Sequence, residues 1–209
     1  MLSILEQIGK IKIIPVVAIK NARDAAPLGE ALLRGGLPCA EITFRTPAAL
    51  DTIKSLARYD EILLGAGTVL TIDQIKQAVD AGALFIVSPG FNDRVVQYCI
   101  EQKIPITPGC CTPTDLSRAL DFGLNIVKFF PADAFGGLKT LKAISAPFQQ
   151  IQFIPTGGIN PQNLPEYLRF PQVIACGGSW MVQSDLISEG RFTEITRLTK
   201  EAVEIAAGI

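Results

Sequence analysis

The feature that most constrains the fold is an alternation, repeated eight times, of a short apolar run and a longer segment with helical periodicity. The runs are rich in β-branched residues, and their ends recur roughly every 19 to 26 residues, about the length of one strand–loop–helix unit. We therefore expect strands at residues 13–19, 39–44, 61–66, 84–88, 104–107, 126–130, 151–155 and 173–176.

The segments between the runs have the periodicity and end signals of helices. Thr46 before Pro47 is typical of an N-cap followed by the first helical residue, and Gly35-Gly36 is typical of a helix end. We expect helices at residues 22–34, 47–58, 71–81, 92–102, 112–122, 138–144, 160–168 and 191–207. A further helix at residues 2–9 precedes the first strand.

Eight consecutive strand-then-helix units favour an α/β fold, a (β/α)₈ TIM barrel, over an open doubly wound sheet. The strands are nearly continuous apolar runs, as expected for parallel strands covered by helices. The extra N-terminal helix is expected to close the bottom of the barrel. Because no Ser/Pro-rich linker interrupts the pattern, we predict a single barrel domain, residues 1–209.

The composition excludes several classes of chemistry and partner. The chain has no histidine, which removes imidazole catalysis, Ser-His-Asp and Cys-His machinery and the usual zinc sites. Its net charge is −1, with no basic run that could follow nucleic acid, and no apolar run approaches the length of a membrane span. The N-terminal segment lacks the features of a signal peptide, and the five cysteines are scattered. We expect reduced thiols in a cytoplasmic protein with no metal.

In a barrel of this kind the active site lies where strands end and the following loops begin. Unusual residues gather at those ends: E-I-T-F-R (41–45), G-A-G-T (65–68), S-P-G (88–90), P-G (108–109), K-F-F-P (128–131), T-G-G (156–158) and G-G-S (177–179). We therefore looked for candidate functional residues among these segments.

Lys128 is the strongest candidate for a catalytic group. A lysine at a strand end ordinarily packs its stem and extends its ammonium group into water. Here apolar residues flank it on both sides, in the stretch N-I-V-K-F-F-P-A (125–132). Burial favours the neutral form of an amine, and the neutral amine is the form that attacks a carbonyl. This context favours a Schiff-base lysine.

Glu41, Thr43 and Arg45 share one face of the second strand, because side chains alternate along a strand. A carboxylate facing a barrel mouth that also contains an amine can transfer the protons that imine chemistry requires. The Arg45 guanidinium could recognise a substrate carboxylate through paired hydrogen bonds. The alternative is a buried Glu41–Arg45 ion pair that only orders the strand.

Two glycine pairs follow the seventh and eighth strands, where barrels often bind phosphate through backbone N–H groups. They are Gly157-Gly158, after Thr156, and Gly177-Gly178, before Ser179. We infer a phosphorylated small molecule as the ligand. The segment G-A-G-T (65–68) lacks the third glycine of a dinucleotide-binding motif, since Leu70 occupies that position.

Six segments together resemble the bacterial 2-keto-3-deoxy-6-phosphogluconate (KDPG)/4-hydroxy-2-oxoglutarate aldolase family. They are E-I-T-F-R-T (41–46), G-A-G-T-V (65–69), S-P-G (88–90), V-K-F-F-P-A (127–132), P-T-G-G-I (155–159) and G-G-S-W (177–180). They occur in the family's order and extend over nearly the whole chain. The resemblance implies a class I aldolase on a (β/α)₈ barrel, a homotrimer that uses no metal or organic cofactor.

The resemblance also implies a role for individual residues. The Schiff-base lysine falls on Lys128 and the proton-transferring glutamate on Glu41. The remaining matches are substrate contacts. Arg45 and Thr68 match the residues that contact the pyruvate carboxylate, with Pro89 nearby, and Phe130 matches the aromatic residue that lines the pocket. Thr156 matches the residue beside the aldehyde half, and the phosphate contacts fall on Gly157, Gly158, Gly178 and Ser179. The expected reaction cleaves KDPG to pyruvate and glyceraldehyde 3-phosphate.

Other readings of the sequence stay open at this point. The same barrel and phosphate loops would suit a sugar-phosphate isomerase or epimerase, or a protein that binds phosphorylated metabolites without turning them over. Within the family, the substrate could be the galactonate epimer of KDPG, and 4-hydroxy-2-oxoglutarate could be a second substrate.

Overall fold

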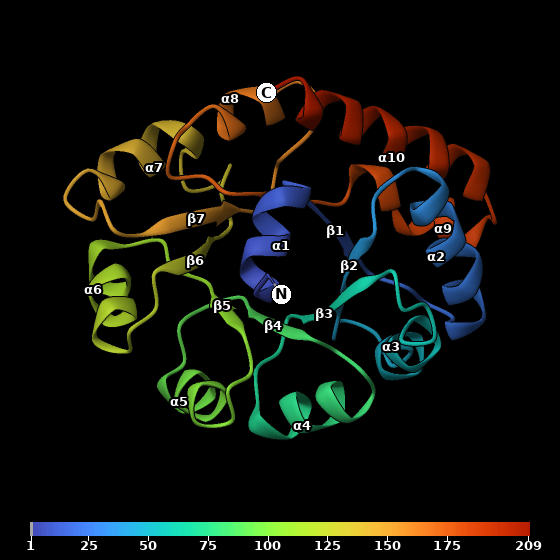
Figure 1. The fold of residues 1–209 in the computed structure, drawn as a ribbon, viewed down its shortest axis with the longest axis horizontal. Coiled ribbons are helices and arrows are strands. Elements are labelled where there is room, and N and C mark those ends of the chain that lie inside the picture. Colours follow the sequence, from blue (N-terminus) through green and yellow to red (C-terminus); the bar gives the residue numbers. More distant parts are fainter. Residues whose placement is uncertain (1) are drawn as a thin grey trace.

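The computed structural model describes residues 2–209, in which eight strands surround a common axis (Figure 1). The strands are β1 (Ile13–Val17), β2 (Cys39–Thr43), β3 (Leu63–Gly67), β4 (Phe85–Ser88), β5 (Ile106–Pro108), β6 (Ile126–Phe129), β7 (Gln152–Pro155) and β8 (Cys176–Gly178). All paired strands are parallel, in a six-stranded sheet of order β5-β4-β3-β2-β1-β8 and the pair β6-β7.

Two single bridges join these sheets into a ring. Gly109 pairs with Lys128 between β5 and β6, and Thr156 pairs with Gly177 between β7 and β8. The ring is thereby closed, which confirms the predicted (β/α)₈ barrel. A strand is present at each predicted run, although each strand is shorter than its run. The eighth prediction, 173–176, is placed too early, because β8 shares only Cys176 with it.

The helices cover the outside of the ring, except for the first, which lies at its centre (Figure 1). They are α1 (Ile4–Ile11), α2 (Ala25–Arg34), α3 (Ala49–Leu56), α4 (Ile72–Asp80), α5 (Asp93–Glu101), α6 (Pro113–Asp121), α7 (Gly137–Ser145), α8 (Leu164–Leu168), α9 (Ser184–Ser188) and α10 (Phe192–Ala207). Short 3₁₀ turns lie at Ala22–Asp24 and Trp180–Val182. The described residues contain no helix with the length and apolar character needed to cross a membrane.

The predicted helix boundaries need three corrections. The segment 160–168 is helical only from Leu164, because the side-chain oxygens of Asn160 and Asn163 each accept a hydrogen bond from the other's backbone N–H and hold this segment in turns. The short helix α9 was not predicted. Thr46 is not an N-cap: α3 begins at Ala49 without a side-chain cap, and the Thr46 hydroxyl instead donates to the Ile19 carbonyl oxygen at 2.5 Å.

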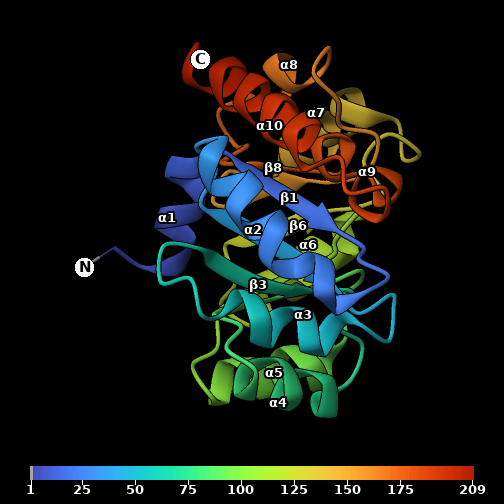
Figure 2. The ribbon, with the colours of Figure 1, turned by 90° about the vertical axis from the view of Figure 1, so that its right-hand side faces the viewer.

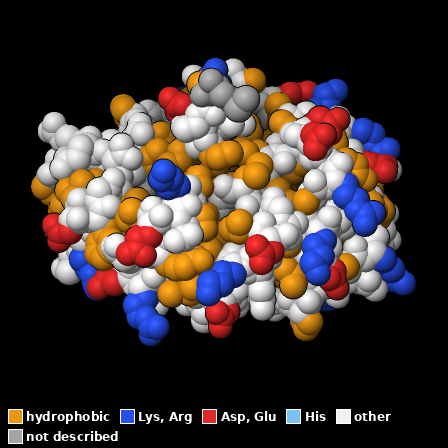
Figure 3. All heavy atoms as spheres, turned by 60° about the horizontal axis from the view of Figure 1, so that its bottom comes forward, with side chains coloured by type: hydrophobic (Ala, Val, Ile, Leu, Met, Phe, Trp, Pro, Cys, Tyr) orange, Lys and Arg blue, Asp and Glu red, His pale blue; other side chains and the backbone are white. Residues whose placement is uncertain are grey.

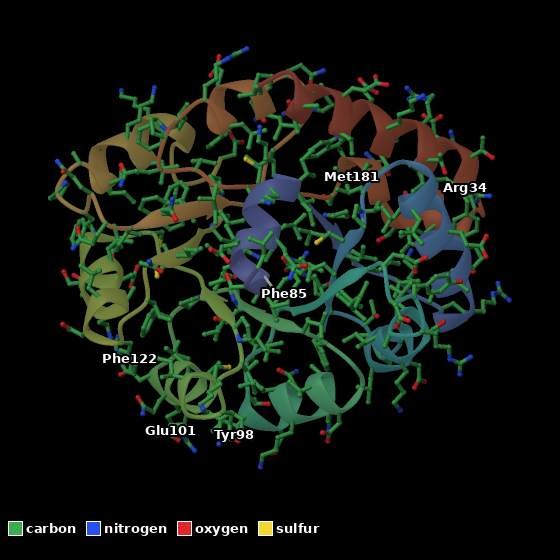
Figure 4. All side chains as sticks on the ribbon, viewed as in Figure 1. Arg34, Phe85, Tyr98, Glu101, Phe122 and Met181 are labelled. Carbon is green, nitrogen blue, oxygen red and sulfur yellow. The ribbon has the colours of Figure 1, made fainter. Side chains whose placement is uncertain are left out.

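The N-terminal helix α1 closes the bottom of the barrel, as predicted. Ser3 and Glu6 form a capping box at its start, and the fully buried Ile8 packs against the interior side chains of the strands. Phe85 is one of these, and it points toward the centre of the ring beneath α1 (Figure 4). In Figure 2, α1 lies at one end and the arrow of β1 points away from it. The carboxyl ends of the strands therefore form the opposite mouth.

The larger core lies between the strands and the surrounding helices, as the apolar runs require. It includes the fully buried Leu28 and Leu32 of α2 and Ile53 of α3. Outside this layer, acidic and basic side chains are interspersed with hydrophobic ones on the face shown in Figure 3. This mixture of charge agrees with the near-zero net charge of the sequence.

Candidate active site

A cavity of about 530 Å³ opens at the carboxyl ends of the strands. Side chains and backbone from β1, β2, β6, β7, β8 and the start of α9 line it. Seven of the predicted site residues are on its wall: Arg45, Phe130, Thr156, Gly157, Gly158, Gly178 and Ser179. The structure thus gathers segments that lie more than a hundred residues apart in the sequence.

Lys128 and Glu41 form a buried pair next to this cavity. Their side chains are 5% and 3% exposed, and the Lys128 Nζ lies 3.5 Å from Oε1 of Glu41. The Lys128 Nζ also lies 4.9 Å from the centre of the Phe130 ring, which lines the cavity. The predicted alternative, an ion pair between Glu41 and Arg45, is therefore wrong, because the partner of the Glu41 carboxylate is the Lys128 amine.

The third strand leaves room for the Glu41 carboxylate because it carries glycine at residue 67, which pairs in register with Thr43. A Cβ added at Gly67 would lie 2.6 Å from Cγ and 2.7 Å from Cδ of Glu41. Contacts this short are not compatible with the observed position of Glu41. The second glycine of G-A-G-T (65–68) is thus explained by the carboxylate beside it, not by a phosphate.

Arg45 and Thr68 meet at the rim of the mouth. The Arg45 Nε donates to the Thr68 Oγ1 at 3.3 Å, and Arg45 is exposed. Thr68 has a φ of 56°, in the left-handed region that a β-branched residue rarely adopts. Such a conformation costs about 1–3 kcal/mol and persists only where the surrounding structure enforces it. It directs the Thr68 hydroxyl toward the guanidinium.

The loops after β7 and β8 expose backbone to the same cavity. Gly157 and Gly158 have φ values of 96° and 80°, and the Asn163 Nδ2 donates to the Gly158 carbonyl oxygen at 2.9 Å. Gly178 precedes Ser179, which also lines the cavity. The two glycine segments therefore face one space, where their N–H groups and the Ser179 hydroxyl can serve as neutral donors to an anion.

Two groups of residues differ from the prediction. Pro89 follows β4 at the same end of the barrel, but it does not line the cavity, so its substrate contact stays a prediction. Conversely, the cavity wall includes Gln183, Ser184 and Asp185, which the sequence did not indicate. The sequence carries little indication of these residues, because they match no motif. They line the cavity only because the chain after β8 folds back over its mouth.

The cysteines have the character of packing residues. Cys110 is buried, and burial together with the nearby Asp115 raises the pKa of its thiol. Cys111 is partly exposed, and the same two causes raise the pKa of its thiol as well. Thiolates, which are the nucleophilic form, are therefore disfavoured at both positions.

Comparison with known proteins decides the family. The family model described as "KDPG and KHG aldolase" matches residues 4–198. The 2-dehydro-3-deoxy-phosphogluconate aldolase of Treponema pallidum (strain Nichols) is 46% identical over 98% of each chain. The chain belongs to the KDPG and KHG aldolase family. This confirms the resemblance seen in the sequence and makes the protein an aldolase, an enzyme that cleaves a carbon–carbon bond.

Two solved structures of this aldolase family show how closely the fold is shared. The KDPG aldolase of Zymomonas mobilis ZM4, solved with 3-phosphoglycerate, has a TM-score of 0.90 and 39% identity, and the match covers 96% of this chain and 95% of that one. The KDPG aldolase of Legionella pneumophila, solved with pyruvate captured as a covalent carbinolamine, has a TM-score of 0.89 and 42% identity, covering 93% and 97%.

Proposed function

We propose that this enzyme is a class I aldolase that cleaves KDPG to pyruvate and glyceraldehyde 3-phosphate, with Lys128 as the Schiff-base residue. The observation that carries the proposal is the buried pair of Lys128 and Glu41 beside a cavity that also holds an exposed arginine and two glycine loops. The carbinolamine in the Legionella relative supports covalent chemistry with pyruvate.

In this mechanism the neutral amine of Lys128 attacks the C2 carbonyl of the substrate to form a carbinolamine. Glu41, whose Oε1 lies 3.5 Å from the Nζ, donates the proton with which the C2 hydroxyl leaves as water, giving a protonated imine. The Glu41 carboxylate, directly or through a water, then takes the proton of the C4 hydroxyl, and the C3–C4 bond breaks with its electrons moving into the imine. This releases the aldehyde phosphate and leaves an enamine on Lys128.

The second half of the reaction returns the enzyme to its starting state. The enamine takes a proton at C3, from Glu41 or from a water that Glu41 holds, and becomes an imine of pyruvate. Water adds to this imine and pyruvate leaves. The burial of Lys128 and the adjoining Phe130 ring keep water scarce around the amine, which limits premature hydrolysis.

The two ends of the substrate require different recognition. The planar guanidinium of Arg45, oriented by Thr68, suits the carboxylate of the pyruvate half. The loops containing Gly157, Gly158, Gly178 and Ser179 suit the phosphate, through backbone N–H groups and a hydroxyl. We propose 4-hydroxy-2-oxoglutarate as a second substrate, which the KHG part of the family description supports.

Borohydride trapping tests this proposal directly. Incubation with pyruvate and reduction should add one pyruvate-derived group to the chain, and peptide mass mapping should place it on Lys128. Lys128→Ala should lose the adduct and about a thousandfold or more of the cleavage rate. Normal cleavage by Lys128→Ala would overturn the mechanism and favour proton-transfer chemistry such as that of an isomerase or epimerase.

Kinetics on three substrates tests the specificity. We expect the highest kcat/KM for KDPG, and lower values for both 4-hydroxy-2-oxoglutarate and the galactonate epimer. A preference for the galactonate epimer would contradict the proposed substrate without touching the Schiff-base chemistry.

The assembly and location follow the family resemblance. We propose a homotrimer in the cytoplasm, which light scattering on the purified protein and fractionation of the source cell would test.

A further inference from the structure

Thr43 is a buried polar residue to which neither the sequence nor the resemblance gives a role. It is 1% exposed and lies on β2, two residues beyond Glu41 and two before Arg45. Its side chain lines the cavity, and its Oγ1 donates to the Val17 carbonyl oxygen at 2.7 Å. A hydroxyl is thus held in a defined orientation at the wall of the active site.

The hydrogen bond to Val17 determines what this hydroxyl can offer to a ligand. A threonine hydroxyl has one hydrogen and two acceptor lone pairs. Because the hydrogen is directed at the backbone, the oxygen can only accept a hydrogen bond from whatever occupies the cavity. A carboxylate anion and a phosphate dianion have no hydrogen to donate, so the ligand group that suits Thr43 is a hydroxyl.

The position of Thr43 indicates which part of the substrate it meets. On one side β2 continues to Arg45, at the carboxylate end of the cavity. On the other side β2 pairs with β1, and β1 pairs with β8, where Pro15 lies beside Gly178 of the phosphate loops. Thr43 therefore lies between the regions assigned to the two anionic ends of the substrate.

β1 and its loop contribute no acceptor side chain to the wall beside Thr43, although Thr156, Ser184 and Asp185 carry acceptor oxygens elsewhere on the wall. The cavity residues contributed by β1 and its loop are Val16 and Ala18, which are apolar. The opposite wall carries Phe130 and Thr156. Leaving a bound substrate hydroxyl without a partner costs free energy, so removal of one well-placed acceptor should have a measurable effect.

We propose that Thr43 is a specificity-determining residue that accepts a hydrogen bond from a hydroxyl of the substrate's aldehyde half, between the keto group and the phosphate. This inference rests on the proposed function, because it assigns the hydroxyl to a bound hydroxy-keto acid. We assign Thr43 no part in forming the imine with pyruvate, because pyruvate carries no hydroxyl and the C2 hydroxyl of the carbinolamine is protonated by Glu41.

Two reactions of the same enzyme separate this role from a structural one. Cleavage of KDPG needs the aldehyde half, whereas exchange of the methyl hydrogens of pyruvate with deuterated water needs only Lys128 and the groups around the pyruvate half. Thr43→Val should lower kcat/KM for KDPG cleavage about tenfold, the size expected for one lost hydrogen bond. The exchange rate, followed by NMR, should stay within about twofold of the parent.

Two control variants sharpen the comparison. Thr46→Val removes a bond of the same kind, from a hydroxyl on the same chain segment to the Ile19 carbonyl oxygen, at a residue outside the cavity wall. It should leave both reactions close to those of the parent, and Thr43→Ser, which keeps the hydroxyl, should recover most of the cleavage.

Equal losses of cleavage and exchange in Thr43→Val would overturn the proposal and make Thr43 a structural residue. Unchanged cleavage in this variant would also overturn the proposal. Failure of the proposed function has a different signature, since the parent enzyme would then show neither exchange nor a borohydride adduct.

Discussion

Gly67 provides a demanding test of the idea that the position of the Glu41 carboxylate determines activity. The residue pairs in register with Thr43 of β2. A Cβ built on it would nevertheless lie 2.6 Å from Cγ and 2.7 Å from Cδ of Glu41, two residues earlier on β2. Carbon atoms in ordinary contact are 3.4–4 Å apart. Gly67→Ala must therefore displace the Glu41 side chain, or the strand beneath it, by about 1 Å.

A displacement of this size has a known order of magnitude for catalysis. Misplacing a catalytic group by about 1 Å costs roughly 10²-fold in rate, because proton transfer depends on the distance between donor and acceptor. We expect Gly67→Ala to lower kcat for KDPG cleavage about a hundredfold, with a smaller change in KM. Overpacking of the interior should also lower the free energy of unfolding by about 1–3 kcal/mol.

The assay couples released pyruvate to lactate dehydrogenase, and urea unfolding measures the stability of the same preparations. Gly65→Ala is the matched control, because it lies on the same strand and the three atoms nearest to its added Cβ all belong to the Phe85 ring. It should lose stability and keep most of the kcat. A folded Gly67→Ala enzyme with parental kcat would refute the reasoning.

Two further predictions concern the phosphate loop and the buried thiols. Ser179→Ala should raise KM for KDPG several-fold, because the lost hydroxyl donates to the phosphate. KM for 4-hydroxy-2-oxoglutarate, which has no phosphate, should stay nearly unchanged. Equal effects on both substrates would contradict the assignment of Ser179 to the phosphate. Burial raises the pKa of Cys99 from 9.0 to about 12, so the unfolded chain loses this proton first as the pH rises. Between pH 9 and 12 the free energy of unfolding should therefore fall, by up to about 1.4 kcal/mol per pH unit for this group, and Cys99→Ala should lessen that slope in urea titrations.

The barrel could be predicted from the sequence because its period is encoded in every unit. Strands buried on both faces must be apolar, and the helices between them need one apolar face, so the alternation is visible without tertiary information. The helix ends were predicted less well where side chains have long-range partners. Thr46 has the sequence context of an N-cap, but its hydroxyl donates to the Ile19 carbonyl oxygen in the loop after β1, a partner that is 27 residues away.

The candidate site could be predicted only in part, for a similar reason. Lys128 stands out because a charged residue interrupts an apolar run, and the glycine pairs stand out because they follow strands. The partner of Glu41 could not be fixed in this way. The strand ends predicted a shared mouth for Glu41 and the Lys128 amine, but spacing left Arg45, four residues away, as an alternative partner. The observed partner, Lys128, is 87 residues away across the barrel. Thr43 was noted for its face of the strand but not for its fixed hydroxyl, which depends on a carbonyl of β1.

The glycines at the strand ends also show why a motif alone does not establish a ligand site. A Cβ at Gly178 would collide with the Trp180 ring, and one at Gly158 with the Asp133 side chain, so packing already requires glycine at both positions. Loss of activity in an alanine variant there would be explained by either phosphate binding or packing. Ser179 is a cleaner probe, since its hydroxyl lines the cavity and can be removed without adding an atom. The case for a phosphate subsite therefore depends on a substrate-selective change in KM, not on the glycines themselves.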